Sequence, residues 1–382
     1  MEDQRSGPPW HVAHVIGHMR TGGAERQLAN YLLAADRAEF RHTLLCLEQP
    51  GEMATSVAAS GIPVTRFHFQ TRYAPLSVMR FAAWLRRERV SVIHTHMHHA
   101  AFWGRLGGIA AGTPVMVTTE HGRELWKNRL QVEIDHQLSR HTARHIAVSQ
   151  ENLEQRIARE RVEPAKLIVI PNGVPMADLA AAPAARQRIR AEFGIADGTP
   201  VFGSVGRFIE AKGYVHMLDA LAVLRCEMPD VVWLSVGDGE LSGPMADRAR
   251  ELGLADNVRW AGRRSDINDL LAAMDIWAMS SIREGLPVAL LEAMSAGKAI
   301  VATAVGGIPD AARRDMEALL VPPADAPALA DAMATLLKDR ARAGALGEQA
   351  RRRAEDCYSI ESIARRIEGI YRAELAAALG GR

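Results

Sequence analysis

The chain has 382 residues, of which 48% are hydrophobic and 24% are charged, and its formal net charge at pH 7 is +1. This composition is ordinary for a globular protein. No apolar run approaches the roughly 20 residues of a membrane span, which argues against an integral membrane protein. The length is too great for one compact core and predicts two domains.

Apolar runs typical of buried strands alternate with helical segments along the whole chain. This alternation predicts an α/β protein with two doubly wound parallel-sheet domains in tandem. In the first half we expect strands at 12–16, 42–46, 64–67, 92–95, 115–119, 146–148 and 167–170. In the second half we expect them at 201–205, 231–236, 258–261, 276–279, 299–303 and 319–321.

A segment with prolines, a glycine and small residues, 171–185, is typical of a linker between domains. We therefore expect one domain over residues 1–175 and a second over 176–358. A last helix with an arginine-bearing polar face is expected over about 359–382.

Two adjacent glycines, Gly22 and Gly23, separate the first strand from an amphipathic helix. They would let the backbone approach a ligand closely and present N–H groups to a phosphate. A plain strand-to-helix turn explains the pair equally well. The dinucleotide fingerprint G-x-G-x-x-G is absent, which argues against a nicotinamide enzyme.

Basic residues are more frequent in the first half of the chain. Residues 1–175 contain 21 Lys and Arg against 16 Asp and Glu, and 13 of the 14 histidines. This mild excess fits a domain that receives its ligand at an anionic surface, and it is too small to indicate nucleic acid. Two segments, 80–90 and 123–130, mix arginines with Trp84 and Trp126, as peripheral membrane patches do. Amphipathic helices with a core Trp are the alternative that we favour.

A histidine-rich run begins at His94. If a strand continued through the run, His94, His96 and His98 would share one face, as in a metal site. No Asp, Glu or Cys at ligand spacing joins them, and the pattern is typical of a strand that ends before a helix. We therefore predict no metal site and expect a structural role or the lining of an acceptor cleft.

A strand rich in β-branched residues ends at Glu120 and His121, just before a glycine. Because ligands bind at the carboxyl ends of strands in open parallel sheets, His121 is a candidate for contact with a substrate. A structural histidine at a strand end remains the alternative.

The stretch from Gly203 to Tyr214 runs from an apolar strand into a glycine turn that carries Arg207 and Lys212. Two fixed cations at such a turn would suit a diphosphate. Solvated surface charge is the alternative for an isolated pair.

The stretch from Glu284 to Thr303 is the most informative in the chain. It contains Glu284 and Glu292, eight positions apart, around a predicted buried helix that follows Pro287 and ends at Gly297. The free N–H groups at a helix start favour an anion, and two carboxylates could accept hydrogen bonds from sugar or ribose hydroxyls. An ordinary helix with one buried, paired glutamate is the alternative.

The N-terminus and the cysteines bear on the compartment. Residues 1–10 are polar and contain no apolar stretch typical of an export signal, so we expect a cytoplasmic protein. Cys46, Cys226 and Cys357 have no C-x-x-C spacing, which argues against a disulfide framework or a zinc site. We expect all three to be buried.

Taken in order, these motifs resemble the large retaining glycosyltransferase family four, of the GT-B fold group. The stretches that carry the resemblance are GGAERQLAN, VIHTH, TEHG, AVSQ, IPNGV, GRFIEAKG, GDGE, the glutamate stretch and VGGIPD. Family members often carry a glycine-bearing segment before LLVPP, whereas this chain has RRDMEALLVPP, which bears on a peripheral loop.

The resemblance implies two Rossmann-like domains facing a central cleft, with the last helix crossing back onto the first domain. The N-terminal domain would bind the acceptor and the C-terminal domain a nucleotide-sugar. The residues so predicted for catalysis are Arg207, Lys212, Glu284 and His121. Those predicted for donor binding are Gly22, Gly23, Asp238, Arg263, Gly285, Leu286 and Glu292.

The function predicted is transfer of a sugar from a nucleoside-diphosphate sugar to an acceptor hydroxyl, with retention and without a cofactor. No DxD motif is present to hold a metal. By resemblance, the acceptor would be a glycan or lipid-linked glycan of envelope or exported polysaccharide, with peripheral contact at the cytoplasmic membrane face and no nucleic acid partner. The alternatives are a GT-B epimerase or phosphorylase and a non-catalytic sugar-nucleotide-binding protein.

Overall fold

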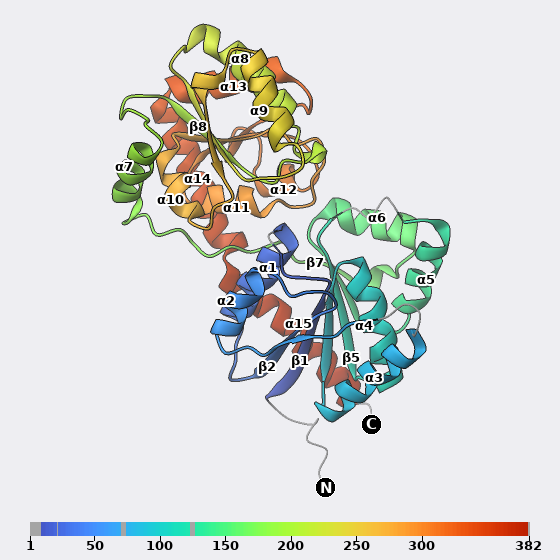
Figure 1. Ribbon diagram of the computed structural model, residues 1–382. Coiled ribbons are helices and arrows are strands. Elements are labelled where there is room, and N and C mark those ends of the chain that lie inside the picture. The colour runs from blue at the N-terminus through green and yellow to red at the C-terminus, as the bar shows by residue number, and fades with distance from the viewer. Residues whose placement is uncertain (1–8, 21, 70–73, 123–126, 381–382) are drawn as a thin grey trace. The chain divides into compact units, whose positions relative to one another are not determined.

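The computed structural model describes residues 9–20, 22–69, 74–122 and 127–380 (Figure 1). The chain divides into two compact units, and each is described by itself. The N-terminal unit consists of Met1–Gly173 together with Ile360–Arg382, and the C-terminal unit of Val174–Ser359.

The N-terminal unit is built on a seven-stranded sheet of parallel strands in the order β3-β2-β1-β4-β5-β6-β7. The strands are β1 (Trp10–Ile16), β2 (Phe40–Cys46), β3 (Val64–Arg66), β4 (Val92–His96), β5 (Val115–Glu120), β6 (Arg144–Ala147) and β7 (Leu167–Val169). The helices are α1 (Gly23–Ala34), α2 (Met53–Ala59), α3 (Ala74–Arg87), α4 (His98–Ala111), α5 (Arg129–Ser139), α6 (Gln150–Glu160) and α15 (Ile360–Gly380).

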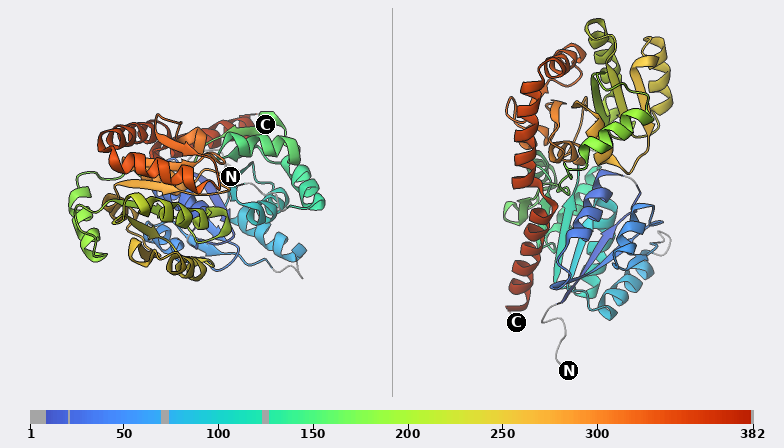
Figure 2. Two further views of the ribbon diagram at one scale, coloured as in Figure 1. Left: turned by 90° about the horizontal axis from the view of Figure 1, so that it is seen from above. Right: turned by 90° about the vertical axis from the view of Figure 1, so that its left-hand side faces the viewer.

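Alternating side chains of the strands build a core on each face of this sheet, as the period of two of a strand requires. Val12 and Ile16 of β1 pack in one core with residues of α1, α2 and α15. Ala13 and Val15 belong to the other core, with residues of α3 and α4. The last helix of the chain, α15, therefore completes the N-terminal unit, and Figure 2 shows it lying along the sheet.

The C-terminal unit has a six-stranded parallel sheet in the order β10-β9-β8-β11-β12-β13. The strands are β8 (Val201–Val205), β9 (Val232–Val236), β10 (Val258–Gly262), β11 (Ile276–Met279), β12 (Ala299–Thr303) and β13 (Ala318–Val321). The helices are α7 (Ala182–Glu192), α8 (Tyr214–Glu227), α9 (Ser242–Glu251), α10 (Ile267–Ala273), α11 (Val288–Ser295), α12 (Ile308–Ala311), α13 (Ala326–Lys338) and α14 (Arg340–Tyr358).

Each sheet reverses its strand order at one place. The reversal lies between β1 and β4 in the N-terminal unit and between β8 and β11 in the C-terminal unit. In open α/β sheets, ligands bind outside the carboxyl ends of the strands at such a reversal. The loops that follow these four strands are therefore where a site is expected.

The predicted α/β fold with two doubly wound parallel sheets is confirmed, and each expected strand has a counterpart within a few residues. The expectation for the cysteines is wrong in one case. Cys46 is buried and Cys357 is partly buried, but Cys226 is exposed because it lies on the outer face of α8, one turn after the exposed Val223. No helix in the described part of the chain has the length and apolarity needed to cross a membrane.

Candidate active site

A lysine and a glutamate from two different loops form an ion pair in the C-terminal unit. Lys212 follows β8 and Glu284 follows β11, the two strands that flank the reversal of the sheet. Lys212 Nζ donates to Glu284 Oε1 at 2.6 Å, and Ser281 Oγ donates to the same oxygen at 2.6 Å. Only 18% and 10% of the two side chains are exposed, so the pair is largely shielded from water.

Close backbone contact between the two loops holds this pair. Gly213 has a φ of +60°, and a Cβ there would lie 2.3 Å from the carbonyl oxygen of Ser280. Ser280 Oγ donates to the Lys212 carbonyl at 3.1 Å, and Ile282 N donates to the Ala211 carbonyl at 2.9 Å. Glycine is therefore required after Lys212 both for its left-handed backbone and for this approach.

A third segment of the chain, at Gly306 and Gly307, also contacts the loop that carries Glu284. Gly306 has a φ of +57°, and a Cβ there would lie 2.3 Å from the Glu284 carbonyl oxygen, while Gly307 N donates to the Gly285 carbonyl at 2.6 Å. Helix α11 begins four residues after Glu284, with Pro287 as its extended N-cap. Its first free N–H groups thus follow directly on the glutamate loop.

Other residues of this unit that are predicted to bind the donor lie after the carboxyl ends of β11 and β9. Leu286 is buried and Glu292 is partly buried on α11. Asp238 follows β9, and its Oδ1 accepts hydrogen bonds from Ser242 Oγ at 2.9 Å and from Gly239 N at 2.8 Å. These bonds, with the nearby charge of Arg263, lower the pKa of Asp238.

Arg207 lies in the loop between β8 and Lys212. Its side chain is exposed, and its guanidinium makes no hydrogen bond or ion pair with any residue that the structure describes. Phe208 N donates to the Asp238 carbonyl at 3.1 Å, and a Cβ on Gly237 would lie 1.9 Å from the Gly206 carbonyl oxygen. The loops after β8, β9 and β11 are therefore joined by direct contacts at one end of the sheet.

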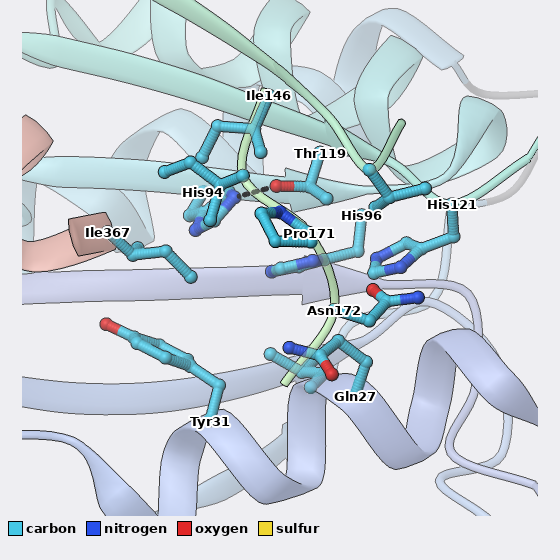
Figure 3. Close-up of a pocket in the computed structure, with 13 residues that line it drawn as sticks. Gln27, Tyr31, His94, His96, Thr119, His121, Ile146, Pro171, Asn172 and Ile367 are labelled. Atoms are coloured by element: carbon cyan, nitrogen blue, oxygen red, sulfur yellow. Dashed lines mark hydrogen bonds between the residues drawn. The ribbon is translucent and has the colours of Figure 1, made fainter. Parts of the chain in front are cut away.

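His121 belongs to the N-terminal unit, where it follows β5 and lines a pocket (Figure 3). Its ring stacks on His96 with centroids 5.8 Å apart, and Asn172 lies beside it. Burial lowers the pKa of His121 to about 4, against smaller opposing effects of Asn172 and Glu120. The ring is therefore neutral at pH 7 and can serve as a hydrogen-bond partner rather than a cation.

The two glycines before α1 differ in their surroundings. A Cβ on Gly22, the N-cap of α1, would lie 2.2 Å from Glu25 Oε2, whereas a Cβ on Gly23 would meet nothing within 4 Å. Because the Glu25 carboxylate is the end of a flexible side chain and can move, neither glycine is required by a close backbone contact.

His98 does not share a strand face with His94 and His96, in agreement with the predicted strand that ends before a helix. Strand β4 ends at His96 and α4 begins at His98, which turns the His98 side chain toward α5. There its Nδ1 lies 3.3 Å from Asp135 Oδ2. Trp84 is partly buried and stacks on Phe81, as favoured, while Trp126 lies outside the described residues.

A buried network of six charges next to His121 was not predicted from the sequence. Its members are Arg105, Glu120, Lys127, Asp135, Arg156 and Glu160, all at most 5% exposed at the side chain. Lys127 Nζ lies 2.7 Å from Asp135 Oδ2 and 3.1 Å from Glu160 Oε1, and Arg156 pairs with Glu120. Three carboxylates balance three cations, so the network fixes Glu120 at the end of β5, next to His121, without a net charge.

Two doubly wound domains, with a fixed Lys–Glu pair beside a helix start at the strand reversal of the second, are the architecture of the GT-B fold group. Sequence models of two families match the chain: Glycosyltransferase Family 4 over residues 21–178 and Glycosyl transferases group 1 over residues 185–353. The chain belongs to glycosyltransferase family four, as the motifs predicted, and is a glycosyltransferase of glycan biosynthesis.

Three similar proteins illustrate the match. The chain is 26% identical over 341 residues to UDP-Gal:α-D-GlcNAc-diphosphoundecaprenol α-1,3-galactosyltransferase of Escherichia coli, covering 86% of this chain and 88% of that one. It is 33% identical over 175 residues to the lipopolysaccharide core biosynthesis glycosyltransferase LpsE of Rhizobium meliloti, covering 46% of this chain and 50% of that one. The structure of Anabaena HepE in complex with UDP-glucose matches with a TM-score of 0.84 and 23% identity. The match covers 95% of this chain and 99% of that one.

The close approach at Gly213 yields a first prediction. Replacing Gly213 with Ala should lower the thermal unfolding temperature by more than replacing Gly194, because Gly194 shares the left-handed φ but would place its Cβ in open space. Gly194→Ala is expected to cost only the backbone strain of about 1–2 kcal/mol. Equal losses in the two variants, measured by differential scanning fluorimetry, would contradict the contact with Ser280.

The buried network yields a second prediction. Burial opposes the charged form of Glu120, but Arg156 and Lys127 outweigh it and lower the pKa to about 2, from an ordinary 4.5. The carboxylate therefore contributes stability above pH 4.5 that is lost as the pH falls toward 2. Glu120→Gln should leave Arg156 poorly paired, destabilise the protein by about 3–5 kcal/mol at pH 7, and lose less further stability on acidification.

Glu133→Gln is the matched control, because Glu133 pairs with Arg161 at the surface, where both side chains are about half exposed. It should change unfolding little at any pH. Thermal unfolding between pH 3 and 8 measures both variants, and similar behaviour of the two would refute the role of the buried network.

Proposed function

We propose that this chain transfers a hexosyl group from a nucleoside-diphosphate sugar to an acceptor hydroxyl, with retention of anomeric configuration and without a metal ion. The donor binds to the C-terminal unit, at the loops after β8 and β11. The acceptor, a glycan or lipid-linked glycan of a cell envelope or exported polysaccharide, binds to the N-terminal unit.

The observation that carries this proposal is the Lys212–Glu284 pair at the strand reversal. When the bond between the sugar C1 and the diphosphate breaks, negative charge develops on the leaving phosphate oxygens. Lys212, the unpartnered guanidinium of Arg207 and the free N–H groups at the start of α11 are the groups that would stabilise this charge. Positive side chains thus take the part that a metal ion plays in other sugar transfers.

The carboxylates of the site suit hydroxyl groups of the donor. Glu284 would accept a hydrogen bond from the transferred sugar, and Glu292, farther along α11, from the ribose. His121, neutral at pH 7, would contact the sugar from the N-terminal unit. Gly22, Gly23 and the backbone at Gly285 and Leu286 would lie near phosphate or sugar.

The names of the similar proteins support the donor class and the setting. The Escherichia coli relative uses UDP-Gal and an undecaprenol-linked acceptor, LpsE acts in lipopolysaccharide core biosynthesis, and HepE binds UDP-glucose. An undecaprenol-linked acceptor would also bring the N-terminal unit to a membrane.

Substitutions at the ion pair test the function. Lys212→Ala and Glu284→Gln should each lower kcat by on the order of 10²–10³-fold, because each removes a group that acts on the transferred sugar or its leaving group. Lys338→Ala, which removes a surface Lys–Glu pair of the same unit, should leave transfer unchanged. Thermal-shift screening against UDP-, GDP-, ADP- and CDP-sugars first identifies the donor.

Three results would count against the proposal. Full transfer activity of Lys212→Ala or Glu284→Gln would show that the ion pair is not needed for the reaction. Strong inhibition by a chelator would contradict metal independence. A donor sugar that is altered without any acceptor would indicate an epimerase instead. Nuclear magnetic resonance of the product's anomeric proton tests retention.

One face of α3 supports peripheral contact with a lipid surface. Leu76 and Met79 are 56% and 68% exposed, and Arg80 is exposed beside them on the same face, while Phe81 and Leu85 are buried on the other. A helix with apolar and basic residues on its exposed face binds anionic lipid interfaces. We infer that this face contacts the cytoplasmic side of the membrane that carries the acceptor.

The double variant Leu76→Glu/Met79→Glu should weaken binding to vesicles containing an anionic phospholipid by at least about tenfold, because it removes two apolar side chains from the interface and adds repulsion. Val223→Glu, at an exposed apolar position on α8 of the other unit, is the control. Co-sedimentation with vesicles measures all three proteins. Unchanged binding of the double variant would refute the contact.

A further inference from the structure

Histidines from three neighbouring strands of the N-terminal unit share one face of its sheet. His42 lies on β2, His14 on β1, and His94 and His96 on β4. His14 is in register with His94, and strand alternation places both on the face of Val12, which packs against α1 and α15. His14 and His94 are 0% exposed and His96 is 4% exposed, in a position where apolar residues are usual.

The nitrogens of three of these rings converge. One ligand nitrogen from each of His14, His94 and His96 lies within 4.8 Å of the others. His14 Nδ1 and His96 Nε2 are 3.3 Å apart. Two nitrogens bound to one tetrahedral cation at about 2.0–2.1 Å are themselves roughly 3.3 Å apart, so this pair already has the spacing of two ligands of zinc.

The surrounding groups match those that orient metal-bound imidazoles. A ligating histidine usually donates its other ring N–H to a neighbour, which fixes the ring. His14 has His42 Nδ1 at 3.0 Å from its Nε2, and His94 has Thr119 Oγ1 at 2.7 Å from its own Nε2. The Nδ1 of His14 then faces His96, whereas the Nδ1 of His94 contacts the Tyr371 hydroxyl, a contact that a cation would replace.

The hydrogen bonds of the cluster leave room for a cation in place of one of them. In the series His42–His14–His96, each contact needs one nitrogen to donate and the other to accept. Whichever way the protons point, His42 Nε2 and His96 Nδ1 remain without a hydrogen-bond partner among the described residues. A cation between His14 and His96 would use a lone pair from both rings in place of their mutual hydrogen bond, and it would leave His42 Nε2 and His96 Nδ1 as they are.

We propose that His14, His94 and His96 bind a divalent first-row cation, zinc above all, at a site apart from glycosyl transfer. Imidazole is a preferred ligand of such ions. Burial lowers the pKa of all three rings, which keeps them neutral as ligands must be. The Tyr371 hydroxyl contacts His94 Nδ1 and lies beside the set.

Such a cation would join elements that are distant in the chain. His14 and His94 belong to β1 and β4, the two strands at the reversal of the sheet. The ion would therefore fasten these two strands to each other at the centre of the N-terminal unit. Its function is structural, so it is compatible with transfer that needs no metal.

The test uses the full-length chain without a polyhistidine tag, produced in zinc-supplemented medium and passed over a chelating resin. Inductively coupled plasma mass spectrometry should find about one zinc per chain. His14→Gln and His96→Gln should each reduce this to well below half. The control His141→Gln, at an exposed histidine of the same unit, should retain it. Circular dichroism verifies that the variants fold.

Cobalt loading of the unaltered protein keeps the test decisive if the variants do not fold. Refolding with Co²⁺ should produce the visible absorption bands of tetrahedral cobalt, and refolding with Zn²⁺ should raise the thermal unfolding temperature in a concentration-dependent way. If the protein holds no tightly bound metal after loading with Co²⁺ and with Zn²⁺, the proposal is overturned. The imidazoles would then form only a hydrogen-bonded series. Equal metal in the folded variants would overturn it too. Neither readout depends on activity, so failure here is separate from failure of the proposed transfer.

Discussion

The ion pair between Lys212 and Glu284 depends on the contact of two backbone turns, and the candidate site depends on the pair. A lysine shielded from water without a partner would carry a large desolvation cost, and Glu284 removes it in the free enzyme. The pair forms only because Gly213 lets its turn meet the carbonyl of Ser280. The arrangement of charge is therefore set by the backbone before any ligand binds, which is what stabilisation of a leaving group requires.

The strands were predictable because buried parallel strands are continuous apolar runs, distinct from the amphipathic helices between them. The end of β4 was predictable too, although His98 continues the alternation of the strand in sequence: the chain leaves the strand after His96, where Met97 adopts a left-handed backbone with a φ of +68°. The error concerns a cysteine on a helix. Cys226 was wrongly predicted to be buried because the faces of its helix, α8, differ little in hydrophobicity.

The ion pair of the candidate site could be predicted from the sequence, but the buried polar clusters of the N-terminal unit could not. Lys212 and Glu284 lie in local motifs whose turn and helix signals can be read in sequence, and parallel strands bring their carboxyl ends to one edge. The histidine cluster could not be predicted, because His14 lies eighty positions before His94 and only the strand order makes them neighbours. The charged network was hidden likewise: Glu120, Asp135 and Glu160 belong to three separate elements.

The two units place their buried polar groups differently. In the C-terminal unit the strands are lined by apolar side chains such as Trp233 and Trp277, and the ionic contact of the candidate site occurs in the loops beyond them. In the N-terminal unit, buried histidines lie on β1, β2 and β4 themselves, and a balanced charge network joins Glu120 of β5 to residues of α4, α5 and α6. Apolar residues there would give a more stable core. Buried polar pairs need specific partners, so this unit gains a defined orientation of its strand ends at the expense of stability.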